Sequence, residues 1–112
     1  MEVTENDVQQ AEARMQAQRA AGYAVSARYD AQQQRVAVRL HNGVHFSFPT
    51  ALAEGLAGAA PGDLAEIEIS PAGRGLHWPR LDADLYVPAL LQGVFGSQAW
   101  MARLALEQQK AA

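Results

Sequence analysis

The residues best suited to chemistry in this 112-residue sequence lie close together, between Gly73 and Leu85. The imidazole of His77 can act as an acid, a base or a metal ligand, and the carboxylates of Asp82 and Asp84 can serve the same purposes. Together they could form an acid and base pair or part of a metal site. Their spacing supports neither function strongly, because the usual zinc and calcium motifs need further ligands that this sequence does not offer.

A structural role explains the same residues with fewer assumptions. The two aspartates can cap a helix that begins near Asp84, and they can pair with Arg74 or Arg80. Trp78 is expected to anchor the core, although with His77 it could instead form an aromatic platform for a ligand. We therefore predict no catalytic residue, no metal site and no cofactor. The candidate interaction surface consists of Arg74, His77, Trp78, Arg80, Asp82, Asp84 and Trp100.

Composition and charge narrow the classes of function. The chain has no cysteine, which excludes disulfides, thiolate zinc sites and cysteine nucleophiles and suits a reducing cytoplasm. Its net charge of −3 argues against broad electrostatic binding to nucleic acid, which depends on clustered lysine and arginine. No apolar run follows the acidic opening residues, so we expect neither a signal peptide nor a membrane anchor. We expect a cytoplasmic protein without membrane contacts.

Alternating apolar and polar residues predict short strands in the middle of the chain. Asn42-Gly43 is a strong hairpin signal between two of them, because both residues tolerate positive φ. The first three strands should therefore form an antiparallel meander. The expected strands cover residues 23–30, 35–40, 44–48, 66–70 and 75–78.

Helices are predicted at both ends of the chain. The first covers residues 4–20, where Thr4 and Asp7 can form a capping box. The last covers residues 97–110, with Ser97 as its N-cap, and a short helix before it should begin at Asp84 or at Val87-Pro88. The apolar face of the first helix is thin and consists of Val8, Ala11 and Met15.

These elements predict a single α+β domain over residues 1–112. We expect a mainly antiparallel sheet of four to five strands, with helices at both termini.

Several blocks of the sequence carry a family resemblance. They are Ala27-Arg28-Tyr29-Asp30, Val36 to Leu40 with Asn42-Gly43, Phe46-Ser47-Phe48-Pro49, Gly58 to Leu64, Gly73 to Trp78, Leu81 to Leu85 and Val87 to Gly96. Over about residues 21–96 the chain resembles the DUF2442 family of small bacterial proteins. The resemblance implies an α+β domain with an antiparallel sheet, encoded in some members beside toxin-like partners or fused to a helix-turn-helix module. It supplies no catalytic residue to carry over.

These observations favour a non-enzymatic protein-interaction module, either antitoxin-like or a regulatory accessory protein. Its partner would be a toxin-like protein or a second copy, bound through a sheet edge, the Trp78 region or the terminal helices. Two alternatives stay open. A small metal-dependent or acid and base enzyme would need His77, Asp82 and Asp84 to converge in a pocket. A DNA-binding regulator would need one face to gather Arg28, Arg35, Arg39, Arg74 and Arg80.

Overall fold

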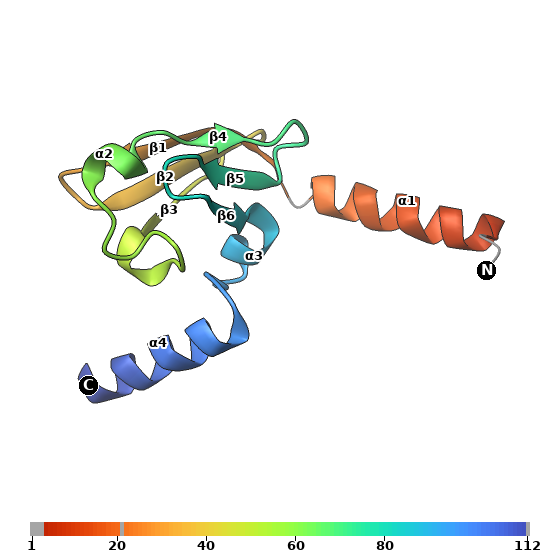
Figure 1. Cartoon of the computed structure of the whole chain (residues 1–112). Helices are drawn as coiled ribbons and strands as arrows, with labels where there is room; N and C mark the ends of the chain where they lie inside the picture. Colours follow the sequence, from red (N-terminus) through yellow and green to blue (C-terminus); the bar gives the residue numbers. More distant parts are fainter. Residues whose placement is uncertain (1–3, 21, 112) are drawn as a thin grey trace.

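The first half of the chain forms a three-stranded antiparallel meander (Figure 1). The structure, a computed structural model, describes the backbone of residues 4–20 and 22–111 and the side chains of residues 4–14 and 22–108. Its strands are β1 (Ala24–Asp30), β2 (Arg35–Leu40) and β3 (His45–Pro49), in the order β1-β2-β3. The predicted Asn42-Gly43 turn joins β2 to β3, with Gly43 at a φ of 88°. The meander is therefore confirmed.

A β-bulge at the start of β1 changes which residues face the core. The register pairs Ala24 with Leu40 but Ser26 with Arg39, so one extra residue lies between the two pairs. The regular alternation of a strand would place Val25 on the same side as Ala27 and Tyr29. Instead Ala24 is buried and Val25 is 44% exposed, because the bulge shifts the alternation by one residue.

A second antiparallel sheet contains a strand, Ala83–Tyr86, that the sequence did not predict. It consists of β4 (Glu68–Ile69), β5 (Gly75–Trp78) and β6 (Ala83–Tyr86), in the order β4-β5-β6. The expected single sheet of four to five strands is therefore wrong: the described residues form two sheets of three strands each. The chain reverses over Pro79 to Asp82, and Asp82 adopts a φ of 48°, which lets the next residues return alongside β5.

The two terminal helices lie where the sequence placed them, and the short helix before the last one takes the later of its two predicted starts. The chain does not become helical at Asp84, because that residue belongs to β6, and the helix starts instead at Val87-Pro88. Proline is favoured in the first turn, where its missing N–H is not needed. The helical elements are α1 (Glu5–Ala20), the 3₁₀ turn η1 (Thr50–Leu52), α2 (Pro61–Leu64), α3 (Val87–Leu91) and α4 (Gln98–Ala111).

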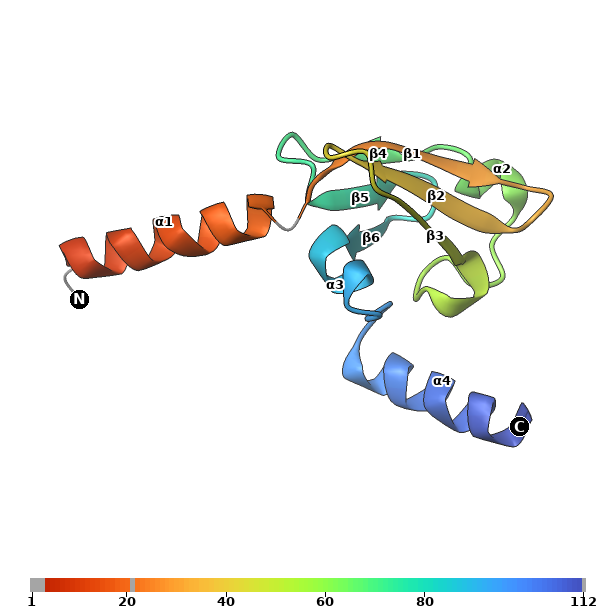
Figure 2. The same cartoon turned by 180° about the vertical axis from the view of Figure 1, so that it is seen from behind.

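The two long helices lie outside the pair of sheets. Figures 1 and 2 show α1 extending away from the sheets at one end and α4 running below them. The predicted capping box of α1 is present, because Thr4 Oγ1 accepts from the backbone N–H of Asp7 and Asp7 Oδ2 accepts from that of Thr4. Among the described helices, none has the length and apolar character needed to cross a membrane.

The inner faces of the two sheets share one hydrophobic core. Trp78 is 0% exposed and is the largest of the fully buried side chains. Around it are apolar residues from both sheets and from α2 and α3. The buried members of this core are Ala24, Val36, Val38, Leu40, Phe48, Ala53, Leu56, Leu64, Leu76, Trp78, Ala83, Leu85, Val87 and Leu90.

Polar contacts hold the beginning of α4 against the segment that contains η1 and Glu54. Trp100 Nε1 donates a hydrogen bond of 2.8 Å to the carbonyl oxygen of Leu52. The predicted N-cap is also present, since Ser97 Oγ accepts from the N–H of Trp100. The N–H of Ser97 in turn donates to the carboxylate of Glu54. These contacts fix the first turn of α4, and the later turns extend beyond them.

Candidate functional site

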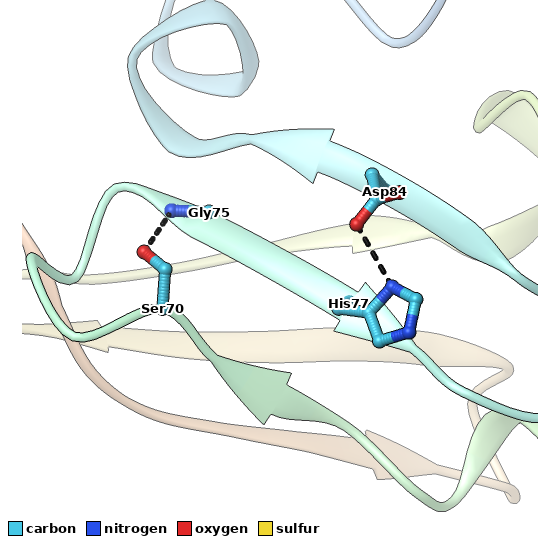
Figure 3. Close-up of polar contacts among 4 residues, drawn as sticks. All are labelled: Ser70, Gly75, His77 and Asp84. Atoms are coloured by element: carbon cyan, nitrogen blue, oxygen red, sulfur yellow. Dashed lines mark hydrogen bonds and ion pairs between the residues drawn. The ribbon is translucent and has the colours of Figure 1, made fainter.

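The outer face of the second sheet carries a row of one histidine between two carboxylates. In the strand register His77 of β5 lies opposite Asp84 of β6 on one side and Glu68 of β4 on the other. His77 Nδ1 donates a hydrogen bond of 2.8 Å to Asp84 Oδ1 (Figure 3). The His77 side chain is 35% exposed and that of Asp84 is 75% exposed. Below, this set is called the carboxylate–histidine row.

The carboxylates of the row change the protonation of its histidine. The hydrogen bond to Asp84 has the largest effect and raises the pKa of His77. Desolvation lowers the pKa by less than that, and the negative charges of Asp84, Glu68 and Asp82 each raise it by a smaller amount. His77 therefore holds its proton to a higher pH than an isolated histidine. The folded state gains stability from this below a pH of about 6.5, the ordinary histidine pKa, and loses that gain as the pH rises through the raised value.

Replacing Asp84 by asparagine should return the pKa of His77 toward its ordinary value. The asparagine keeps the shape of the side chain but removes the charge that favours the imidazolium ion. Titration of the His77 ring protons by NMR measures the effect in each variant. Asp82→Asn is the matched control and should lower the pKa less, because Asp82 acts on His77 through its charge alone. An unchanged pKa in Asp84→Asn would show that this hydrogen bond does not form in solution.

A shallow cavity adjoins the row on the β4 side. Its volume is about 250 Å³, and its lining includes Glu68, Ser70, His77 and Asp84. Ser70 Oγ accepts a hydrogen bond of 2.9 Å from the N–H of Gly75 (Figure 3), and among the described residues no hydrogen bond joins it to His77 as a base would require. Neither Asp84 nor the mouth of the cavity is screened from water. The row can exchange a proton or bind a polar group, but it lacks the enclosed setting that strengthens catalytic electrostatics.

The structure separates most of the residues that the sequence grouped together. Trp78 lies wholly inside the core, so it cannot form an aromatic platform. Arg80 pairs with Glu66 at 3.2 Å and lies 4.0 Å from Asp63, rather than bonding to the nearby aspartates. Asp82 occupies the β5–β6 turn, and Trp100 belongs to α4, where it contacts η1. Arg74 lies half-buried just before β5.

Only two of the three residues proposed for catalysis are joined by a hydrogen bond. His77 and Asp84 meet across β5 and β6, whereas Asp82 lies in the turn beyond the strand ends. Among the described residues, no group of three or more histidine, aspartate or glutamate side chains is arranged to hold a metal ion.

Glu68 is the member of the row that the sequence did not single out. Its alternation with Ile67 and Ile69 placed it on the polar side of a strand, but did not say which strand would lie beside it. The register of β4 on β5 places it next to His77. A row of three residues on three neighbouring strands depends on how the strands pair. The periodicity of a single segment does not say which strand will lie beside it.

Fold and surface together describe a small α+β protein with two three-stranded antiparallel sheets and helical extensions at both ends. The chain belongs to the DUF2442 family, described as proteins of unknown function, which matches residues 24–96. Among proteins with curated descriptions, none matches the chain significantly.

Two solved structures are similar to this chain. A crystal structure of a protein of unknown function from Rhodospirillum rubrum is 50% identical, with a TM-score of 0.69, and the match covers 71% of this chain and 96% of that one. A solution NMR structure of an uncharacterized protein from Chromobacterium violaceum is 35% identical, with a TM-score of 0.73. This match covers 92% of our chain and 95% of the Chromobacterium chain.

Proposed function

We propose that this protein is a non-enzymatic interaction module that self-associates through its terminal helices. The observation that carries the proposal is the exposure of α1, whose described side chains, residues 5–14, are all exposed to solvent. An isolated helix of 16 residues is only marginally stable in water, because its backbone hydrogen bonds barely offset the cost of ordering the chain. A second chain that packs along α1 would supply the missing contacts.

The apolar stripe on α1 suits pairing with another helix. Val8 and Ala11 are three residues apart and face the same side, and Val8 is 46% exposed. The sequence continues this spacing to Met15, whose side chain lies outside the described residues. The small side chain of Ala11 would let another helix approach closely.

A similar stripe lies on the free side of α4. Trp100, Met101 and Leu104 are half-buried, whereas the opposite side of the helix carries Ala99, Ala102 and Leu106. Leu106 is 59% exposed, the largest fraction among the exposed large apolar side chains. The two stripes share the same spacing of three and then four residues, which is the spacing of helix-pairing seams.

A second copy of this chain is the binding partner that fits the stripes on α1 and α4 best. Each stripe is too narrow to bury much area alone, and a symmetric dimer would cover two of them with one set of contacts. A toxin-like partner is the competing occupant. The lack of cysteine is in keeping with a cytoplasmic location for either assembly.

Charge placed on the α1 stripe should weaken self-association. We expect Val8→Glu/Ala11→Glu to raise the dissociation constant of the dimer about tenfold or more, equal to about 1.4 kcal/mol, because both carboxylates would be buried against a helix. Sedimentation equilibrium of the full chain measures this constant. Gln10→Glu/Ala13→Glu is the matched control, with the same added charge on the opposite side of α1.

Three outcomes of the sedimentation experiment would contradict self-association through α1. One is a wild-type chain that stays monomeric at millimolar concentration. The second is an equal effect of the two double variants, which would show a response to charge rather than to the stripe. The third is a monomer that instead forms a stoichiometric complex with a purified toxin-like protein. Circular dichroism of each variant checks that α1 remains helical.

The enzyme and DNA-binding alternatives have less support. His77 and Asp84 form an exposed pair without Asp82, so the convergence required of an active site is incomplete. The five arginines expected of a DNA-binding regulator do not share one face, because Arg80 lies in the turn between β5 and β6 and pairs with Glu66. Three of the five, Arg28, Arg35 and Arg39, do lie together on the outer face of the β1-β2-β3 sheet.

A further inference from the structure

We propose that the outer face of the β1-β2-β3 sheet binds the phosphate group of a small anionic ligand. The face carries Arg28 on β1, Arg35 and Arg39 on β2, and His45 on β3, and this set is called the basic face below. The neighbouring residues Ala27, Val36, Val38 and Phe46 point to the other side, toward the core.

The strand register brings the cations of the basic face together. Arg39 lies opposite His45 on β3 and Ser26 on β1, which makes one polar row across the three strands. In the next row Arg28 lies opposite Ala37, two residues from Arg39 on the same side of β2. Arg28 and Arg39 are therefore diagonal neighbours, at a separation of roughly 7–8 Å that long side chains can span.

The small side chain at the centre of this face leaves a hollow. Ala37 lies between Arg28 and Ser47 in the strand register, and its methyl group rises little above the sheet. A shallow cavity of about 250 Å³ forms there, with Ser26, Arg28, Ala37, Arg39 and His45 in its lining. Donors on three strands thus surround a space large enough for a phosphate group.

The two arginines beside the hollow, Arg28 and Arg39, form no ion pair within the described part of the chain. Both are exposed. Arg35 donates to Ser47 Oγ and to its carbonyl oxygen, which draws it toward β3. The acid on the same side, Asp30, accepts from the N–H groups of the following turn instead. Neighbouring like charges destabilise a sheet unless an anion lies between them.

Phosphate is the anion that these donors suit best. Guanidinium groups bind its oxygens through paired, charge-assisted hydrogen bonds, and Ser26 adds a hydroxyl donor. The outer side chains of this sheet include no phenylalanine, tyrosine or tryptophan on which a base could stack. The protein also carries a net charge of −3, which repels long polyanions. A small phosphorylated ligand is therefore favoured over a nucleic-acid strand.

Titration with pyrophosphate tests the phosphate site. We expect saturable changes in the NMR amide signals of residues 26–28, 37–39 and 45, with a dissociation constant of about 1 mM or lower. Ionic strength is held constant with sodium chloride. Arg28→Gln/Arg39→Gln should weaken binding about tenfold or more, because it removes the donors from both sides of the hollow. The matched control is Arg14→Gln/Arg103→Gln, which removes two exposed arginines from α1 and α4 and should leave binding unchanged.

Three results would overturn the proposal while the signals of each variant show an intact fold. One is the absence of saturation by pyrophosphate. Another is an equal loss of binding in the two double variants, since that would reflect net charge alone. The third is tight binding of a 12-base-pair DNA duplex without binding of pyrophosphate, with a salt dependence that falls by about 0.9 for each arginine removed from the basic face. That result would assign this face to a nucleic-acid backbone instead.

Discussion

Replacing Trp78 by alanine is expected to lower the free energy of unfolding by about 3–5 kcal/mol. Trp78 is fully buried where the inner faces of both sheets meet, so its removal leaves a cavity that neither sheet can fill without moving. The loss is a large part of the total stability of a domain, which is about 5–15 kcal/mol. Urea denaturation followed by far-ultraviolet circular dichroism measures it.

Trp78→Phe separates the effect of volume from that of the indole N–H. Within the described part of the chain, Trp78 Nε1 is buried and has no hydrogen-bond partner. Phenylalanine removes this donor, and burying a donor without a partner costs about 1–3 kcal/mol, so the gain offsets part of the smaller ring's lost packing. We expect Trp78→Phe to cost about 2 kcal/mol or less. A loss as large as that of Trp78→Ala would mean that the N–H is satisfied in solution.

Replacing Gly73 by alanine is expected to have the second largest effect, about 2–5 kcal/mol. Gly73 has a φ of 73°, a conformation that costs other residues energy, and an added Cβ would lie 2.8 Å from the carbonyl oxygen of Ala24. It would also lie 2.9 Å from Cδ2 of Tyr23. The backbone oxygen of Gly73 accepts from the N–H of Ala24 at 2.7 Å, so the two segments cannot separate without losing that bond.

Gly58→Ala is the matched control for the variant at Gly73. Gly58 has a φ of 79°, and an added Cβ there would meet nothing within 4 Å. Only the backbone conformation is then penalised, by about 1–2 kcal/mol. We expect Gly73→Ala to be the less stable of the two by about 1–3 kcal/mol in the same denaturation experiment. Equal losses would show that the start of β1 yields easily to the added methyl group.

The agreement between sequence and structure is best where the signal is local. Thr4 and Asp7 cap α1 as predicted, Ser97 caps α4, and the Asn42-Gly43 turn joins β2 to β3. Each of these features depends on residues within a few positions of one another. Val25 marks the limit of such signals, because a bulge shifts the alternation without changing residue types.

The carboxylate–histidine row and the basic face were outside the reach of local signals. The sequence offered His77 with Asp82 and Asp84 as a possible acid and base group, yet favoured a helix cap or an arginine partner for Asp84 over its hydrogen bond to His77. The strand Ala83–Tyr86 is only four residues long, so its alternation was too short to stand out from the neighbouring turn. Missing β6 removed the pairing that places Asp84 beside His77.

The sequence by itself determined the α+β class, the family, the meander and the helices at both ends. Only the tertiary structure decided that the strands form two sheets, that Trp78 joins them, and that Arg28 lies near Arg39 across β1 and β2. The physical reason lies in strand register. A shift of one residue moves every side chain to the other face of a sheet, and register is set by turns, bulges and the shared core rather than by any single segment.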